Sequence, residues 1–257
     1  MNRLPNMVSA VLLAFAVLPP ALAADVPAVI GWAQRVELGT LVSGVVSEVQ
    51  VRPGQRVSKG DSLLSLDSRG FDSQVSRRLA EHRHAQAMLE EAEREDARAQ
   101  ELYDRTVLSD FERNQALIAL KAARAAAEKA RAGLVQARLD QERSVVRAPF
   151  DGVVLAVNAA PGQTVITELQ SPALVTLADN RVYRARAQVD PEQAAQLEPG
   201  RRLSATVRGQ TLDASVSYVG FEPVTQDGGT PRYELVTDIV AGGQALRVGE
   251  TVTLHLE

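Results

Sequence analysis

The sequence has 257 residues, of which 45% are hydrophobic and 23% charged, with a net charge of −4 at pH 7. This mild acidity argues against a nucleic-acid-binding surface, and the absence of cysteine excludes disulfides, a lipid-modified N-terminal cysteine and thiol chemistry. Aromatic residues make up only 4% of the chain, so several small cores are expected rather than one large enzyme domain.

The first residues have the features of a cleavable export signal. Arg3 precedes an apolar run at 7–18, and Ala21-Leu22-Ala23 has the small-residue pattern of a cleavage site. The apolar run is too short to span a bilayer. We therefore expect residues 1–23 to be a signal peptide, and the mature chain to begin near Ala24 in a bacterial periplasm. An uncleaved membrane anchor is the alternative.

Two stretches, 43–57 and 151–165, repeat one pattern at a constant offset. In each, the letters GVV begin a valine-rich strand that leads to a Pro-Gly turn and a second short strand. The glycine allows a positive φ, and the proline presets the first corner of the turn. Neither half can bury its apolar face alone, so we expect residues 24–70 and 144–180 to pair as one small β-domain.

The inserted segment 71–143 is predicted to form two long helices. It contains no proline and a single glycine, and good helix formers dominate it. After a break, Ser109 is followed three residues later by Glu112, which is the pattern of a capping box. We expect an antiparallel hairpin with helices at about 71–105 and 109–143, projecting from the β-domain.

The second predicted helix has a heptad seam, in which steps of four and three residues alternate: Ala116, Leu120, Ala123, Ala127, Ala130, Leu134 and Ala137. The first helix is rougher, because Asp96 interrupts the series of Ala85, Leu89, Ala92, Ala99 and Tyr103. Alanine lets helices approach closely but buries little apolar area. The hairpin should therefore hold its register with modest stability, and its charged faces are either solvated or packed against further copies of the chain.

Residues 181–257 are predicted to form a second all-β unit. Five strands are expected at 182–189, 202–207, 212–221, 233–240 and 251–256, and a sixth is possible in this small antiparallel barrel. A short helix at 191–197 should begin after Asp190 as its N-cap.

Together, the split β-unit, the long hairpin, the second barrel and the export signal resemble the periplasmic adaptor, or membrane fusion, family. The letters VRAPFDGVV at 146–154 are similar to the family's lipoyl (barrel-sandwich hybrid) domain, and those at 197–207 and 246–254 to its β-barrel. The resemblance implies an elongated α+β protein: a split lipoyl-like barrel-sandwich hybrid, an inserted antiparallel coiled-coil hairpin, then a small antiparallel β-barrel. No full membrane-proximal domain is recognisable.

The same resemblance implies a non-catalytic adaptor subunit of a tripartite efflux system. Its partners would be an inner-membrane transporter, with the RND type as first choice, a TolC-like outer-membrane channel, and further copies of the chain in a trimer or hexamer. The adaptor of an ABC exporter or type I secretion system is one alternative. A structural coiled-coil protein without a transport role is another.

At the predicted tip, Arg98, Leu102 and Ser109 match the spacing with which adaptors of this family dock onto a TolC-like channel. The resemblance implies that Arg98 donates hydrogen bonds to the channel, that Leu102 fills a small apolar notch, and that Ser109 both caps the second helix and touches the partner. The plain alternative is a solvated arginine, an ordinary seam leucine and a serine that serves only as a cap.

No catalytic, cofactor or metal site is predicted. A lipoate or biotin carrier needs an exposed lysine in a β-turn, where this chain reads LDSR at 66–69. His82 and His84 lie two residues apart on a helix and point in different directions, and His255 is isolated, so they do not form a ligand set. The chain has no GxSxG, HExxH or phosphate-binding glycine loop.

Overall fold

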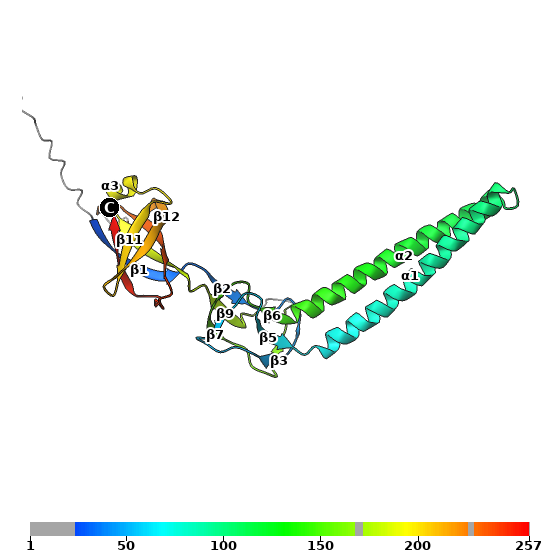
Figure 1. The fold of residues 1–257 in the computed structure, drawn as a ribbon, viewed down its shortest axis with the longest axis horizontal. Helices are drawn as coiled ribbons and strands as arrows, with labels where there is room; N and C mark the ends of the chain where they lie inside the picture. The colour runs from blue at the N-terminus through cyan, green and yellow to red at the C-terminus, as the bar shows by residue number, and fades with distance from the viewer. Residues whose placement is uncertain (1–23, 168–171, 226–228, 257) are drawn as a thin grey trace, which may run out of the picture. The chain divides into compact units, whose positions relative to one another are not determined.

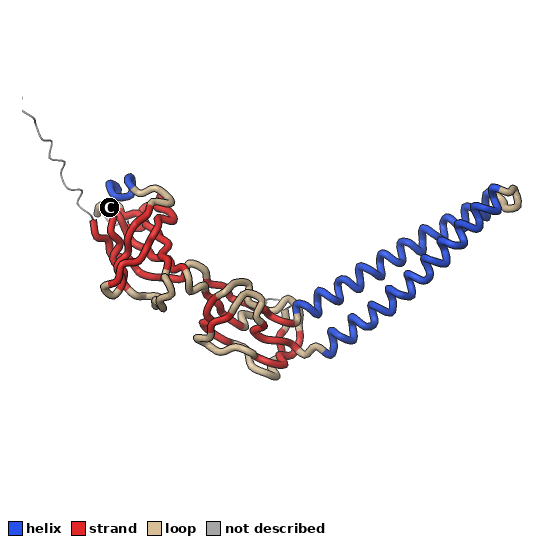
Figure 2. Tube along the Cα trace, in the orientation of Figure 1, coloured by secondary structure: helices blue, strands red, loops and turns tan. Residues whose placement is uncertain are grey.

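The computed structural model describes residues 24–167, 172–225 and 229–256. The chain divides into two compact units, one of Trp32–Tyr183 with Gly243–Ala245, the other of Met1–Gly31, Arg184–Gly242 and Leu246–Glu257 (Figure 1). Strands build the barrel of the second unit and the sheets of the first, and the long helices are confined to the hairpin of the first unit (Figure 2). The predicted signal peptide lies outside the described residues.

The first unit contains two four-stranded antiparallel sheets. One has the order β2-β9-β7-β4, with β2 at Arg35–Leu38, β9 at Val175–Ala178, β7 at Gly152–Val157 and β4 at Arg56–Val57. The other has the order β6-β5-β3-β8, with β6 at Val145–Arg147, β5 at Ser62–Leu66, β3 at Gly44–Val49 and β8 at Thr164–Val165.

Each repeated stretch contributes one strand to each sheet. β3 pairs with β8, where Gly44 lies opposite Val165, and β4 pairs with β7, where Val57 lies opposite Gly152. These are equivalent positions of the repeat, so the two halves make the same pairing twice, each time with the other half. The predicted pairing of the half-units is confirmed, although the valine-rich strands β3 and β7 themselves lie in different sheets.

Side chains from both halves fill one core. The first half supplies Val46, Val51, Val57, Leu63, Leu64 and Leu66, and the second supplies Val146, Ala148, Val154, Val165, Leu174, Val175 and Leu177. Full burial of one valine or leucine contributes about 1.5–3 kcal/mol. The two halves therefore stabilise each other through one shared core.

The insert is the predicted antiparallel hairpin, with α1 at Arg69–Asp104 and α2 at Asp110–Arg143 (Figure 1). All seven predicted seam positions of α2 are buried or half-buried. In α1 the heptad spacing continues through polar side chains, since Arg78, His82 and Asp96 are also half-buried. Arg78 packs beside Gly133 of α2, where a Cβ would lie 3.6 Å from the arginine Cδ, an ordinary van der Waals contact. The seam is continuous in spacing but partly polar.

The second unit contains a closed six-stranded barrel with the strand order β1-β10-β13-β12-β11-β14. The strands are β1 (Ala24–Trp32), β10 (Val182–Val189), β11 (Arg202–Val207), β12 (Gln210–Thr225), β13 (Arg232–Val240) and β14 (Thr251–Leu256). The predicted short helix is α3 (Pro191–Gln196), and its N-cap carboxylate, from Asp190, accepts a hydrogen bond from the Gln193 backbone N–H at 2.8 Å.

The strand that closes the barrel is β1, from the N-terminal end of the described chain, which pairs with β14. A polar contact supports this closure. His255 Nδ1 lies 2.6 Å from Asp25 Oδ1, and its Nε2 lies 2.8 Å from Thr206 Oγ1. One imidazole of β14 thereby links the two strands on either side of it, β1 and β11.

Candidate functional site

The hairpin tip is a short loop that is closed by backbone hydrogen bonds. The Thr106 N–H donates to the Tyr103 carbonyl at 2.8 Å, and the Val107 N–H donates to the Leu102 carbonyl at 2.9 Å. This is the bond pattern of a Schellman motif, with Thr106 at a φ of 58°. A β-branched residue in the left-handed region costs about 1–2 kcal/mol. The loop conformation is therefore imposed by the hairpin.

The start of α2 is fixed by the predicted capping box. The Glu112 backbone N–H donates to Ser109 Oγ at 3.3 Å, and the Ser109 backbone N–H donates to Glu112 Oε2 at 3.1 Å. The Ser109 hydroxyl, which donates to Glu112 Oε2 at 2.7 Å, and the Ser109 backbone N–H together lower the pKa of the Glu112 carboxyl. Across the tip, a hydrogen bond to Asp110 raises the pKa of the Tyr103 hydroxyl. Both ends of the loop are thus held by side chains.

The three residues predicted to dock onto a channel all lie at this end of the hairpin. Arg98 is exposed, and its Nη1 donates to Glu95 Oε2 at 3.1 Å within α1. Leu102 lies one turn closer to the tip and is half-buried, and its carbonyl is used by the Schellman motif. Ser109 is exposed and caps α2. Leu102 and Ser109 therefore have structural roles, whether or not a partner contacts them.

Two apolar side chains at the tip were not predicted from the sequence as site residues. Val107 in the loop and Phe111 in the first turn of α2 are each 70% exposed. A phenylalanine near a helix start is usually assigned to a core, so its sequence position gives no signal of exposure. An exposed valine and phenylalanine beside a rigid loop form a small apolar surface that suits a protein partner.

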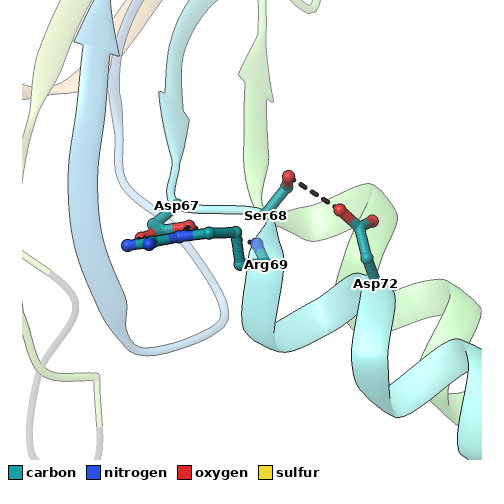
Figure 3. Close-up of polar contacts among 4 residues, drawn as sticks. All are labelled: Asp67, Ser68, Arg69 and Asp72. Carbon is teal, nitrogen blue, oxygen red and sulfur yellow. Dashed lines mark hydrogen bonds and ion pairs between the residues drawn. The ribbon is translucent and has the colours of Figure 1, made fainter.

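At the opposite end of the hairpin, a polar network fixes the root (Figure 3). The Arg69 side chain donates to both carboxylate oxygens of Asp67, with Nε at 2.9 and 3.0 Å. Asp72 accepts hydrogen bonds from the Ser68 hydroxyl at 2.8 Å and from the Gln141 side-chain amide of α2 at 2.6 Å. The root residues thus join the end of β5, the start of α1 and the end of α2.

The root network lowers the pKa of the Asp67 carboxyl, which gives a testable prediction. Hydrogen bonds from the Arg69 side chain and backbone lower the pKa of Asp67 from 3.8 to about 2. Because the folded-state pKa is depressed, this contact stabilises the fold above about pH 3.8, and the contribution is lost as the pH falls through about 2. In Arg69→Ala, the pKa of Asp67 should rise toward 3.8, as followed by the carboxyl ¹³C shift; an unchanged pKa would contradict the assigned cause.

Among the described residues, no group of three or more His, Cys, Asp or Glu side chains could hold a metal ion. The stretch 66–69, where a carrier domain would present its lysine, instead ends β5 and opens α1.

Residues 34–179, more than half of the chain, match the sequence family described as CzcB-like, barrel-sandwich hybrid domain. The chain belongs to the membrane fusion protein, or periplasmic adaptor, family. The adaptor is 32% identical over 190 residues to the macrolide export protein MacA of Yersinia pestis, an alignment covering 68% of this chain and 51% of the relative. It is 28% identical over 193 residues to MacA of Escherichia coli O157:H7, and this alignment covers 70% of this chain and 52% of the relative. The adaptor thus spans about half the length of these curated relatives.

Solved structures share the adaptor fold. A membrane fusion protein of Streptococcus pneumoniae R6 superposes with a TM-score of 0.69 at 18% identity, covering 90% of this chain and 97% of that one. MacA of Actinobacillus actinomycetemcomitans superposes with a TM-score of 0.61 at 22% identity, covering 90% of this chain and 78% of that one. Members of the family are non-enzymatic linkers, as the sequence predicts for this chain. No described helix has an apolar stretch long enough to cross a bilayer.

Proposed function

We propose that this adaptor links an inner-membrane transporter to a TolC-like outer-membrane channel, as the periplasmic subunit of a tripartite efflux system. The observation that carries the proposal is the hairpin itself. Two helices of about 50 Å each project from a barrel-sandwich domain and end in a capped loop with exposed apolar side chains. Such an arm has no site for chemistry, but it presents a fixed surface at a distance.

In this proposal the tip residues contact the channel. Arg98 supplies a guanidinium whose remaining N–H groups are free to donate to backbone carbonyls or a carboxylate of the channel, while Val107 and Phe111 enter apolar notches beside Leu102 and Ser109. A single hairpin cannot enclose a conduit. Several copies, three or six as in the family, therefore stand side by side with their tips toward the channel.

The barrel supplies a second surface, which we assign to the transporter. Phe221 is 99% exposed and lies in a part of β12 where the register with β13 shifts repeatedly. It lines, with Tyr218, Tyr233 and residues of α3, an apolar groove of about 400 Å³. A fully exposed phenylalanine beside such a groove is typical of a protein contact rather than a solvated barrel wall.

The transporter is assigned first to the RND type, because a cleavable export signal suits adaptors of that branch. An ABC exporter is the second candidate. The two are distinguished by isolating the tagged adaptor under mild detergent and identifying the large membrane protein that remains bound to it.

The test of the function is a deletion with complementation. Loss of the gene should lower resistance to at least one exported compound, and macrolides come first because the curated relatives are macrolide export proteins. The full chain should restore resistance, whereas a chain lacking residues 98–112 should not, because it has no channel-docking tip. Unchanged susceptibility to every compound tested, together with no captured membrane protein, would favour the structural coiled-coil alternative.

A further inference from the structure

The second half of strand β12 has a hydrogen-bonding partner on only one side. On the other side, residues 210–215 pair with β11, and the last bonds are made by Val216, whose N–H donates to the Arg201 carbonyl at 2.9 Å. Beyond this point, among the described residues, the strand pairs with β13 alone. Pro223 has no N–H to donate, so we call residues 217–222 the free edge.

The apolar groove of the barrel unit runs along this free edge. Four consecutive residues of β12 line it: Tyr218, Val219, Gly220 and Phe221. Successive side chains of a strand point to opposite faces of the sheet, so a cavity over one face would be lined by every second residue. The opposite wall of the groove comes from the segment 191–199, which contains α3. A partner that fills the groove therefore also covers the backbone groups of the free edge.

The backbone of the free edge restricts which kind of partner can cover it. Exposed backbone N–H and C=O groups are hydrogen-bonded to water, and a partner that excludes this water must replace those bonds. A helix already uses its own backbone groups internally, so it would leave the groups of the edge unpaired. An extended segment can instead join the sheet as a further strand and pair with them. The free edge therefore suits an extended segment.

The side chains that line the groove indicate the chemistry of that segment. Most of the lining is apolar or aromatic, with Leu197 and Tyr233 facing the residues of β12. Glu198 is the one charged residue in this lining; it is exposed, and in the described chain its carboxylate makes no ion pair. An extended segment with apolar side chains and one basic side chain would match both features.

We propose that the free edge binds an extended segment of the inner-membrane transporter, which adds to β12 as a strand and places a lysine or arginine beside Glu198. The inference deepens the proposed transporter contact and rests on it. Residues 217–222 extend about 20 Å at 3.3 Å per residue, so the bound segment is short. A second copy of this chain fits less well, because the register shift between Val219 and Pro223 bends this edge, and bulges and edge prolines oppose the pairing of like strands.

The test adds a synthetic seven-residue peptide, of alternating valine and threonine with a lysine at each end, to the full chain. At saturating peptide, amide hydrogen exchange measured by mass spectrometry should slow at residues 217–222. It should not change at residues 210–215, where β11 already occupies the edge. N-methylation of every second peptide nitrogen removes the donors from one edge of the peptide. Of the two methylated isomers, one should bind at least about tenfold more weakly and the other as well as the parent peptide.

Three variants of the chain test the side-chain contacts by fluorescence anisotropy of a labelled peptide. Phe221→Ala should weaken binding about tenfold, because it removes an anchor of the groove. The matched control is Val224→Ala: this side chain is 58% exposed on the same strand but lines a different cavity, so affinity should be unchanged. Glu198→Lys should reverse the charge preference, so that a peptide with glutamate at each end binds up to about fivefold better than the lysine peptide. Circular dichroism checks that each variant folds.

Equal binding of the two methylated peptides would overturn the proposal, and so would tighter binding of a helical lysine–leucine peptide. Slowed exchange at 217–222 in the full chain alone, growing with protein concentration, would assign the edge to a second copy instead. With the captured transporter bound, exchange should slow at the same residues.

The proposed function is tested separately by gene deletion and complementation. Unchanged drug resistance together with peptide binding would reject the function and keep the free edge as a strand-binding site. Restored resistance without peptide binding would reject this inference and keep the function.

Discussion

Replacing Gly152 by alanine should destabilise the barrel-sandwich unit by about 3 kcal/mol or more, which is typical of overpacked or strained core sites. A Cβ at this position would overlap the Ala178 carbonyl oxygen and lie 3.1 Å from its carbon and 3.3 Å from the Phe150 ring. Neither backbone can retreat, because β7 and β9 are paired where Val153 lies opposite Ala178. Glycine is required at this position because there is no room for a Cβ, and not because the backbone has a positive φ.

The repeat supplies the matched control. Gly44 is the equivalent residue of the first half, and a Cβ there would lie 3.1 Å from Leu66 Cδ1, the movable end of a side chain. Gly44→Ala should therefore cost about 1 kcal/mol, within the usual range for a tolerated core change. The single tryptophan, Trp32, belongs to this unit and reports urea unfolding by fluorescence. Equal losses in the two variants would contradict the steric explanation.

This pair of glycines illustrates what a sequence pattern can and cannot predict. The repeat indicates that Gly44 and Gly152 begin equivalent strands of one fold and that the two halves pair, because these features are local or symmetric. The different neighbours of the two glycines come from β9 and β5, which lie outside the repeated letters. The sequence therefore predicts the domain but not which glycine is indispensable.

The hairpin also has some features that the sequence predicts and others that it does not. Ser109 and Glu112 predict the helix start because a capping box involves only near neighbours. Asp96 was interpreted as an interruption of the seam, yet it lies half-buried at a seam position. The helix α1 continues without a break through this residue, so the heptad spacing of the seam is kept although the side chain is polar. The barrel closure by β1 was not predicted either, since pairing of the first strand with the last leaves no local signature in the sequence.

The tip is the least predictable part of the candidate site. Arg98 and Leu102 were selected from a resemblance, because the residues that recognise a partner have no periodic requirement of their own. Val107 and Phe111 were missed for a related reason: apolar letters near a helix start indicate burial unless the tertiary structure leaves them exposed. Residue spacing can locate the tip, but a measurement with the partner has to assign the contacts.

Channel capture should be lost when Arg98→Asp and Ser109→Asp are combined. Aspartate is as good an N-cap as serine, so the start of α2 is kept while a negative charge replaces a small hydroxyl at the tip. Arg98→Asp reverses the guanidinium charge proposed to face the channel. If both residues contact the channel, each change removes a central contact, and affinity should fall at least 30-fold, as for other interface hot spots. Surface plasmon resonance on the purified TolC-like channel measures the loss.

Two further variants separate docking from folding. Ser109→Ala removes the cap, and the cost of about 1 kcal/mol falls on α2; if the serine matters only as a cap, this variant should weaken capture more than Ser109→Asp does. Arg77→Asp reverses a charge on the same face of α1, three heptads from Arg98 and far from the tip, and should leave capture unchanged. Equal binding by wild type and the double aspartate variant would exclude both residues from the contact, and Val107 and Phe111 would then be the surface to test.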